Sequence, residues 1–235
     1  MSHALIEIAS VVKDHAGVQP LRINTLRVDR GDRYTLAGFD AGAAETLIHL
    51  ITGAALPDEG DVRIAGASTR DIATDTAWLA SLDRFGLVTS RAVLLGHLTL
   101  ADNLALPLTL SIDPIPDHMR PEVERLADDV GLARDRLTAA VEALSPVERV
   151  RLNLARAVAS NPALLLLEHP TATLDAGSAA AVGTTLRRLA DARGLGWIAL
   201  SGDDHFARAA RGRRLTLQPG TGDLQESSLL RRLFG

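Results

Sequence analysis

The sequence predicts an α/β fold with a buried parallel sheet, a smaller antiparallel sheet and a helical segment. Two short apolar runs, residues 164–167 and 196–200, are typical of strands that are buried on both faces. Residues 34–37 indicate a third strand, which leads through a loop of small residues into a helix. Alternating apolar residues at 4–12 and 21–28 predict antiparallel strands at the start of the chain.

The loop after residues 34–37 contains Gly38 and Gly42. A strand, a small-residue loop and a helix form the layout of a phosphate-binding loop, because glycines let backbone N–H groups converge on phosphate at a helix N-terminus. We expect the helix itself over residues 47–52, and Gly53 ends it.

This loop lacks the side chains that phosphate binding needs. A lysine normally neutralises the β and γ phosphates, and a Ser or Thr hydroxyl holds Mg²⁺. In register these positions are Ala44 and Glu45, followed by Thr46, and the single lysine of the chain is Lys13. A carboxylate at position 45 repels phosphate, so the sequence predicts a phosphate-type loop that binds nucleotide poorly.

The middle of the chain, residues 91–160, is expected to be mostly helical. Residues 94–108 indicate a loop and an amphipathic helix, and residues 111–121, with three prolines, are typical of a linker. A charged amphipathic helix is predicted over residues 122–130, ending at Gly131.

The next helix carries strong start and stop signals. Ser145 is the expected N-cap, Glu148 completes a capping box, and Pro146 occupies the first helical position. Asn161 and Pro162 end the helix.

The rest of the chain continues the alternation of strands and helices. The strand at residues 164–167 leads into Glu168 and His169, at the carboxyl end where open α/β sheets bind their ligands. A helix is expected over residues 178–193, and a last strand over residues 214–218 follows the buried run that begins at Gly196.

Composition limits the classes of protein that the chain can belong to. Its 235 residues can bury a full core, and 46% of them are hydrophobic. A net charge of −4 gives no electrostatic drive toward nucleic acid. The absence of cysteine excludes a disulfide scaffold and fits the cytosol. No apolar run reaches the ~18 residues of a spanning helix, and the N-terminus does not resemble a secretory signal.

Many of these residues resemble the ATP-binding subunits of ABC transporters in order and spacing. The family has an LSGGQ or LSGGE turn, a helix with RxxxARA, and a strand followed by a Leu-Asp turn. The matching residues here are Leu144, Ser145, Glu148, Arg151, Ala155, Arg156, Ala157, Pro170, Thr171, Leu174 and Asp175. Residues 94–108 further resemble the branch that serves lipoprotein release, macrolide export and cell division.

The resemblance implies a P-loop NTPase (RecA-like) ABC ATPase fold with an antiparallel β subdomain and a helical subdomain. We expect one such domain over residues 1–235. Residues 1–90 and 161–220 would form the α/β core with the β subdomain. Residues 91–160 would form the helical subdomain with the signature-like turn, and residues 221–235 a C-terminal tail that docks or frays.

The resemblance also assigns functional positions, several of which hold altered residues. His169 stands where the family has its catalytic Glu, and Gly202 where it has a phosphate-sensing His. Glu168 takes the place of the magnesium-binding Asp and is the one metal candidate. Ser90 takes the place of a Gln that links Mg²⁺ to the membrane subunit. His15 takes the place of an adenine-stacking aromatic, although a solvated turn is the simpler interpretation.

The signature-like turn is partly retained. Ser145, Glu148 and Asp175 keep the residue types of the family, whereas Pro146 and Val147 replace two glycines. Pro146 lacks an N–H and both residues are bulkier, so the turn would be impaired but usable toward a phosphate of a second subunit.

These observations favour a degenerate ATP-binding-cassette subunit of an ABC transporter complex that hydrolyses ATP poorly or not at all by itself. The resemblance implies ATP and Mg²⁺ as cofactors, with weak binding expected at this chain's own site. It also implies a dimer, either of two copies or with a different ATP-binding subunit, and it implies a membrane permease, an active ATPase partner, or both, as partners. The expected location is the cytoplasmic face of the plasma membrane.

Two alternatives remain open. The chain could be a pseudo-ATPase scaffold or regulator that uses the fold for protein contacts only. It could also be an active ATPase with unusual site residues, which the single lysine disfavours.

Overall fold

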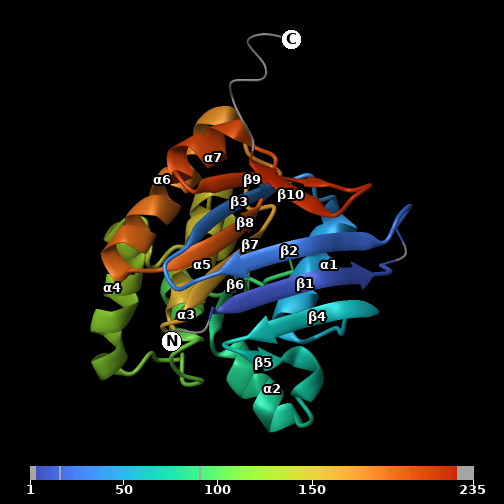
Figure 1. Ribbon diagram of the computed structural model, residues 1–235. Coiled ribbons are helices and arrows are strands. Elements are labelled where there is room, and N and C mark those ends of the chain that lie inside the picture. The colour runs from blue at the N-terminus through green and yellow to red at the C-terminus, as the bar shows by residue number, and fades with distance from the viewer. Residues whose placement is uncertain (1–3, 16, 90, 227–235) are drawn as a thin grey trace.

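The computed structural model describes residues 4–15, 17–89 and 91–226, and it contains two sheets with helices packed around them (Figure 1). Within these described ranges, one sheet has four strands and the other has six. The chain passes back and forth between the sheets in its first part. It then runs through a group of helices and returns to the larger sheet.

The smaller sheet is antiparallel, with the order β2-β1-β4-β5. Its strands are β1 (Ile6–Lys13), β2 (Leu21–Val28), β4 (Glu59–Ile64) and β5 (Ala67–Ser68). Ile8 pairs with Leu26 on one side and Val62 on the other, and all three are buried. Paired residues of neighbouring strands share a face, so the alternation predicted for the first two strands is confirmed.

The larger sheet has the order β10-β9-β3-β8-β7-β6, and only the pair of β10 and β9 is antiparallel. Its strands are β3 (Arg33–Ala37), β6 (Phe85–Val88), β7 (Leu164–Glu168), β8 (Gly196–Leu200), β9 (Arg213–Gln218) and β10 (Asp223–Glu226). In β7, Leu165 and Leu167 join one hydrophobic cluster, while Leu164 and Leu166 join another. The apolar run is therefore a strand buried on both faces, as predicted.

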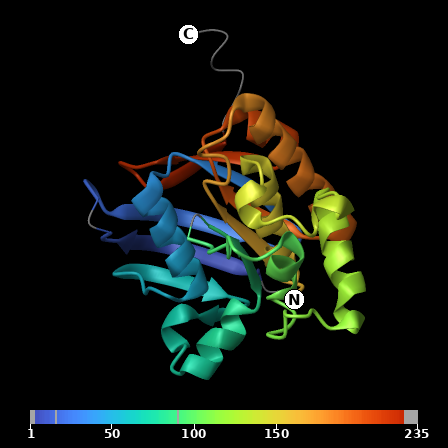
Figure 2. The ribbon, with the colours of Figure 1, turned by 180° about the vertical axis from the view of Figure 1, so that it is seen from behind.

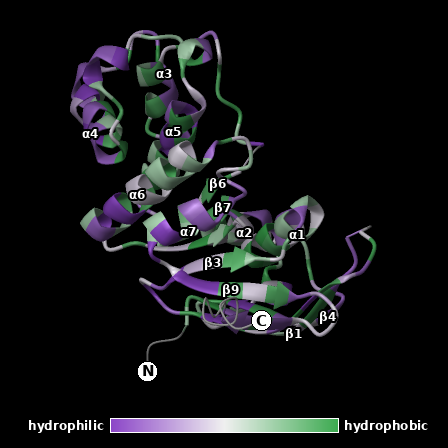
Figure 3. Cartoon of the chain, turned by 90° about the horizontal axis from the view of Figure 1, so that it is seen from above, coloured by the Kyte–Doolittle hydropathy of each residue, from purple (hydrophilic) through white to green (hydrophobic). Residues whose placement is uncertain are grey.

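Helices surround the larger sheet and extend beyond it. In the described part of the chain the α-helices are α1 (Ala41–Thr52), α2 (Asp75–Leu82), α3 (Leu100–Ala105), α4 (Arg120–Val130), α5 (Pro146–Val158), α6 (Ala176–Arg193) and α7 (Asp204–Ala210). Seen from behind, α1 and α2 lie on the side of the smaller sheet and α4 on the opposite side (Figure 2). From above, α3, α4 and α5 gather at one end of the molecule, far from β1 and β4 (Figure 3).

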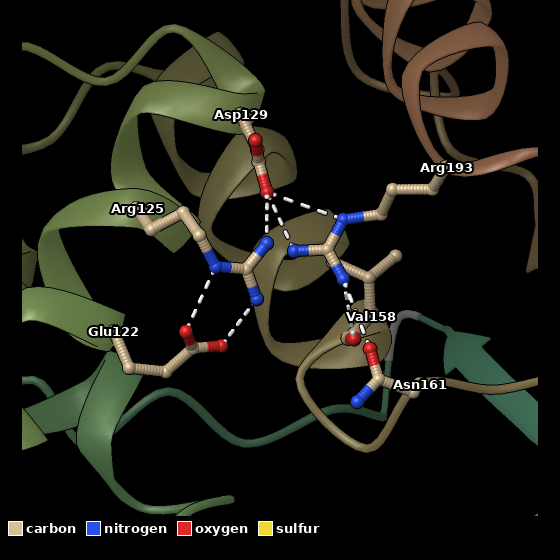
Figure 4. Close-up of polar contacts among 6 residues, drawn as sticks. All are labelled: Glu122, Arg125, Asp129, Val158, Asn161 and Arg193. Atoms are coloured by element: carbon tan, nitrogen blue, oxygen red, sulfur yellow. Dashed lines mark hydrogen bonds and ion pairs between the residues drawn. The ribbon is translucent and has the colours of Figure 1, made fainter.

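Arg193, the last residue of α6, connects α6 to α4 and α5 through hydrogen bonds (Figure 4). It donates two hydrogen bonds to Asp129 of α4, at 2.5 and 3.2 Å, and one to the Val158 carbonyl at the end of α5, at 3.1 Å. Arg125 also contacts Asp129, and it pairs with Glu122. The Arg193 and Asp129 side chains are only 13% and 23% exposed, so solvent screens this pair less than a surface ion pair.

Several elements differ from expectation. Helix α1 begins at Ala41 rather than at residue 47, because Asp40 caps it and the small residues that follow are compatible with a helix. Helix α2 was not expected, since none of its residues is buried and it has little apolar periodicity. Residues 223–226, assigned to the C-terminal tail, form β10, and the tail from residue 227 onward lies outside the described residues.

Other local predictions are confirmed. The capping box at the start of α5, the end of α4 at Gly131 and the strand at Gly196–Leu200 are all present. None of the helices in the described ranges is long and apolar enough to cross a membrane.

Candidate functional site

The loop between β3 and α1 depends on one glycine and one carboxylate. Gly38 has a φ of 86°, and a Cβ there would lie 2.8 Å from the Leu217 carbonyl oxygen, so the loop requires glycine at this point. Asp40 caps α1 by accepting a hydrogen bond of 2.8 Å from the Ala43 N–H. The positive end of the helix dipole is therefore matched by a negative charge of the chain itself.

The first turns of α1 place the other loop residues. Gly42 lies within the helix, beside the ring of His15. The Ala44 side chain is fully buried, and Thr46 is 9% exposed. Glu45, by contrast, has a side chain that is 42% exposed and reaches neighbouring charged groups. Position 44 therefore presents a buried methyl group and no charge toward the loop.

An arginine bridges two carboxylates at the ends of α1 and β7. The Arg91 guanidinium contacts Glu45 through Nη1, and through Nη2 it donates a hydrogen bond of 2.8 Å to Glu168. His49, one turn after Glu45, lies 3.9 Å from the same Glu45 carboxylate. The Glu168 side chain is only 6% exposed, and Arg91 is 44% exposed. A positive charge thus lies between the two positions that the sequence assigned to magnesium coordination.

His169 and Gly202 follow neighbouring strands, β7 and β8. His169 adopts a φ of 44°, and its N–H donates to the Leu200 carbonyl at 3.0 Å. Its Nε2 atom is buried without a hydrogen-bond partner among the described residues. A Cβ at Gly202 would meet no atom within 4 Å, so this position is open. Next to it, Asp203 caps α7 with its carboxylate.

His15 lies closer to the loop than a solvated turn residue would. A Cβ built at Gly42 would lie 3.1 Å from its Nδ1 atom, and the residue is half-buried. Beside the ring is a cavity of about 210 Å³, lined also by Arg22, Asp40 and Leu217. His15 therefore packs against the phosphate-type loop and is only partly exposed to solvent.

The signature-like turn uses its polar side chains to start α5. Ser145 accepts a hydrogen bond from the Glu148 N–H, and the Glu148 carboxylate accepts hydrogen bonds of 2.8 Å from the Ser145 N–H and hydroxyl. Arg136 also donates to Glu148, at 3.2 Å. Burial raises the pKa of Glu148, but these hydrogen bonds and the Arg136 charge outweigh it and hold the pKa below its usual value.

Asp175 plays the same structural role at the start of α6. It accepts hydrogen bonds from the Ser178 N–H and hydroxyl, both at 2.9 Å. These bonds lower the pKa of the Asp175 carboxyl. The position of Ser90 lies outside the described residues.

No group of three or more His, Cys, Asp or Glu side chains in the described ranges has the arrangement of a metal site. Glu168 is the metal candidate from the sequence, and its nearest charged partner is the guanidinium of Arg91. The strand ends at this edge of the sheet thus carry a glutamate already paired with a cation.

Comparison with known proteins identifies the chain's family. Residues 21–172 match a family model described as ABC transporter, and this match covers more than half of the chain. The chain belongs to the ABC transporter family. Its fold and family are those of the ATP-binding subunits of ABC transporter complexes.

Among the relatives of this ABC protein are three types of ATP-binding protein. It is 27% identical over 214 residues to the lipoprotein-releasing system ATP-binding protein LolD of Acinetobacter baylyi, covering 89% of this chain and 93% of that protein. It is 32% identical over 182 residues to the methionine import ATP-binding protein MetN 2 of Enterococcus faecalis, covering 73% of this chain. It is also 29% identical to a macrolide export protein, MacB 1 of Aeromonas hydrophila, over 77% of this chain. The chain spans 50% and 28% of the lengths of these last two relatives.

Solved structures agree with the family assignment at the level of the fold. The dimeric ATP-binding cassette MJ0796, solved with ADP and Pi, superimposes with a TM-score of 0.72 at 23% identity and covers 94% of this chain and 97% of its own. The cassette cbiO1 from Clostridium perfringens gives a TM-score of 0.74 at 16% identity, covering 94% and 87%. The ABC ATPase fold predicted from the sequence is therefore confirmed, as is the resemblance to the lipoprotein-release and macrolide-export proteins.

Two residues at this site were not singled out from the ABC-like sequence pattern. Asp40 occupies a loop position whose role as a cap depends on α1 starting early. Arg91 pairs with Glu168 across 77 positions of sequence, a distance that no local pattern reveals. One signal was present in the sequence, since a glutamate at the end of a strand that is buried on both faces requires a nearby cation.

Proposed function

We propose that the chain is an ATP-binding-cassette subunit whose own nucleotide site is degenerate, so that it hydrolyses ATP poorly or not at all by itself. It acts with a membrane permease and with a second, active ATP-binding subunit at the cytoplasmic face of the membrane. One observation carries the proposal: Asp40, Glu45 and Glu168 place three carboxylates around the loop that would hold a triphosphate, and the single guanidinium of Arg91 is already shared by two of them.

The charges near this loop oppose phosphate. A triphosphate is polyanionic, and phosphoryl transfer depends on cations that neutralise it. Ala44 offers no charge at the lysine position, and Lys13 pairs with Asp58 at 2.6 Å in the smaller sheet. The carboxylate of Asp40 already accepts a hydrogen bond from an N–H at the start of α1. These residues therefore do not fit Mg-ATP.

A groove beside β6 supports a permease as partner. β6 is the edge strand of the larger sheet, and a cavity of about 290 Å³ lies between it and α5. Leu87 and Val93 near this groove are 38% and 69% exposed. The Oδ1 atom of Asn153, which lines the cavity, lacks a hydrogen-bond partner within the described residues. Exposed apolar side chains beside a groove are suited to a protein contact.

The signature-like turn supports a second ATP-binding subunit. Ser145 and the N-terminus of α5 remain, although Glu148 accepts hydrogen bonds from the Ser145 N–H and hydroxyl. In a head-to-tail pair, this chain would offer its turn to a nucleotide held by the partner. The family's cassettes dimerise and work with membrane permeases, which fits such an arrangement.

Calorimetric titration with Mg-ATP tests the first half of the proposal. We expect a dissociation constant weaker than about 1 mM, corresponding to less than ~4 kcal/mol of binding free energy. The LolD protein of Acinetobacter baylyi, measured under the same conditions, is the positive control. Micromolar, magnesium-dependent binding by this chain would contradict the proposal.

Activity measurements test the second half. ATPase activity is expected only after a second ATP-binding subunit is added, and Ser145→Arg should lower it. Full ATPase activity of the chain alone, unchanged in Ser145→Arg, rules out a site shared between two subunits.

Co-purification tests the permease contact. Val93→Glu should weaken co-purification of a permease, whereas Arg27→Gln, on the smaller sheet, should leave co-purification unchanged.

The scaffold alternative shares the same degenerate site. In that case the chain would retain its partner proteins, but adding an active ATP-binding subunit would not make hydrolysis depend on Ser145. The Ser145→Arg comparison therefore separates the two functions.

A further inference from the structure

The buried Glu168 carboxylate is paired with the guanidinium of Arg91. Its side chain is 6% exposed, and Arg91 provides its only hydrogen bond or ion pair within the described part of the chain. A carboxylate that is nearly removed from water is costly unless it is paired. The same guanidinium reaches Glu45 with its other arm, so one positive charge serves two carboxylates from different elements.

This arrangement resembles what a divalent cation does between two carboxylates. Divalent cations in proteins bind carboxylate oxygens, and a guanidinium offers N–H donors in a rigid fork to the same oxygens. Glu45 and Glu168 stand at the positions assigned to the magnesium hydroxyl and the magnesium carboxylate, an assignment that rests on the proposed function. Arg91 lies between them.

Arg91 is the first residue of the segment 91–95, which also makes hydrogen bonds to helices α3 and α5. The Val93 carbonyl accepts a hydrogen bond of 2.8 Å from Arg156 of α5. The backbone N–H and carbonyl of Leu95 both bond to the Asn103 side chain of α3, at 3.0 Å each. Residues 91–95 therefore join α1 and β7 to α3 and α5 through polar contacts.

We propose that Arg91 is a built-in counter-ion that takes the place of a divalent cation between Glu45 and Glu168. It holds residues 91–95 in one position against α1 and β7, with neither metal nor nucleotide required. The Mg²⁺ that the family resemblance implies between these two positions is replaced here by ion pairs to Arg91.

A matched ion pair elsewhere shows why burial matters. Arg27 also bridges two carboxylates, Glu7 at 2.7 Å and Asp29 at 3.2 Å. The Glu7 and Asp29 side chains are 37% and 54% exposed, so water can solvate them if Arg27 is lost. Glu168 has no such access. Arg27→Gln is therefore a control with the same chemistry and little expected effect.

The test compares the thermal stability of Arg91→Gln, Arg27→Gln and Glu168→Gln, and of the double variant Arg91→Gln/Glu168→Gln. We expect Arg91→Gln to lower the Tm by about 5 °C and Arg27→Gln by about 1 °C. The double variant should recover most of the loss, because no buried carboxylate is left unpaired. The Tm of Arg91→Lys should lie between the Tm values of wild type and Arg91→Gln. If Arg91→Gln does not fold, Arg91→Lys is used in its place.

Magnesium chloride without nucleotide provides the second measurement. At 10 mM and matched ionic strength, Mg²⁺ should raise the Tm of Arg91→Gln by about 3 °C, since two carboxylates then lack a cation. Wild type, Arg27→Gln and the double variant should not respond. Hydrogen exchange in residues 91–95 should be faster in Arg91→Gln than in Arg27→Gln.

Two results overturn the proposal: equal Tm values for Arg91→Gln and Arg27→Gln, or a double variant no more stable than Arg91→Gln. A magnesium response of wild type equal to that of Arg91→Gln overturns it as well. Micromolar Mg-ATP binding by wild type contradicts the proposed function instead, and it leaves the stability comparison unaffected.

Discussion

Helices α1 and α5 begin in the same way but differ in charge. Each starts at a capping side chain that accepts a hydrogen bond from the third residue of the helix: Asp40 for α1 and Ser145 for α5. The cap of α1 is a carboxylate, whereas the cap of α5 is a neutral hydroxyl. The need for a cap is a property of every helix N-terminus, and it exists whether or not a ligand binds there.

The difference shows how a loop can keep its shape while its chemistry changes. At α1 the N-terminal N–H groups face a charge that competes directly with an anionic ligand. At α5 the hydroxyl of Ser145 could turn toward an external phosphate, although Glu148 now holds it. Of these two turns, α5 is therefore better able to contribute to a phosphate site.

Replacing the carboxylates at the start of α1 and adding a lysine there is expected to give the largest effect, which is on ATP affinity. The triple variant Asp40→Ser/Ala44→Lys/Glu45→Ser should raise ATP affinity about 30- to 1000-fold, or ~2–4 kcal/mol, because two repulsive carboxylates are removed and a cation is added. Calorimetry measures the affinity, and circular dichroism confirms folding.

Two related variants separate the contributions. Ala44→Lys/Glu45→Ser keeps the Asp40 carboxylate, and its ATP affinity should rise less than that of the triple variant. Asp40→Ser/Glu45→Ser leaves the buried Ala44 in place, and its ATP affinity should rise about tenfold. A folded triple variant with unchanged affinity would show that the assigned register of the loop is wrong.

Removing the cap of α5 should have a smaller effect, on stability alone. Ser145→Ala should lower the free energy of unfolding by ~1 kcal/mol, since an N–H at the start of the helix loses its acceptor. Asp40→Ser keeps a capping oxygen at α1 and should change the free energy of unfolding by only a few tenths of a kcal/mol. Urea denaturation measures the free energy of unfolding of both variants. A larger loss of stability in Asp40→Ser than in Ser145→Ala would contradict this prediction.

The pH dependence of Glu148 should give the smallest effect. Its pKa lies below the usual value of 4.5, so the stability it contributes is present above pH 4.5 and is lost as the pH falls through the lower, folded pKa. The Tm difference between wild type and Glu148→Gln should therefore narrow as the pH falls from about 6 to about 3. A Tm difference that does not change with pH would show that the carboxylate charge has no part in the cap.

The sequence predicted what nearby residues determine. Ser145, Pro146 and Glu148 lie within four positions, so the start of α5 could be predicted from capping rules alone. The apolar run at 164–167 predicted a strand buried on both faces, because its residues are also adjacent in the sequence. Helix α2 escaped prediction because it buries no residue and thus lacks the apolar period on which such predictions rest.

The candidate site was less predictable because its contacts join distant segments. The positions of Glu45 and Glu168 could be assigned from the sequence, but their shared partner could not. The contact between His15 and Gly42 depends on how the smaller sheet packs against α1. Ion pairs and ring contacts of this kind appear only when the fold places their elements together.

The bridge at Arg91 also constrains how the sequence can change. Exchanging Arg91 alone leaves Glu168 in a poorly hydrated position without its cation, and exchanging Glu45 alone leaves the guanidinium only one of its two carboxylates. A substitution of Arg91 alone therefore frees both carboxylates for a metal ion but lowers the stability of the protein. Arg91 and the buried Glu168 are therefore expected to change together during evolution, whereas the more exposed Glu45 can change by itself.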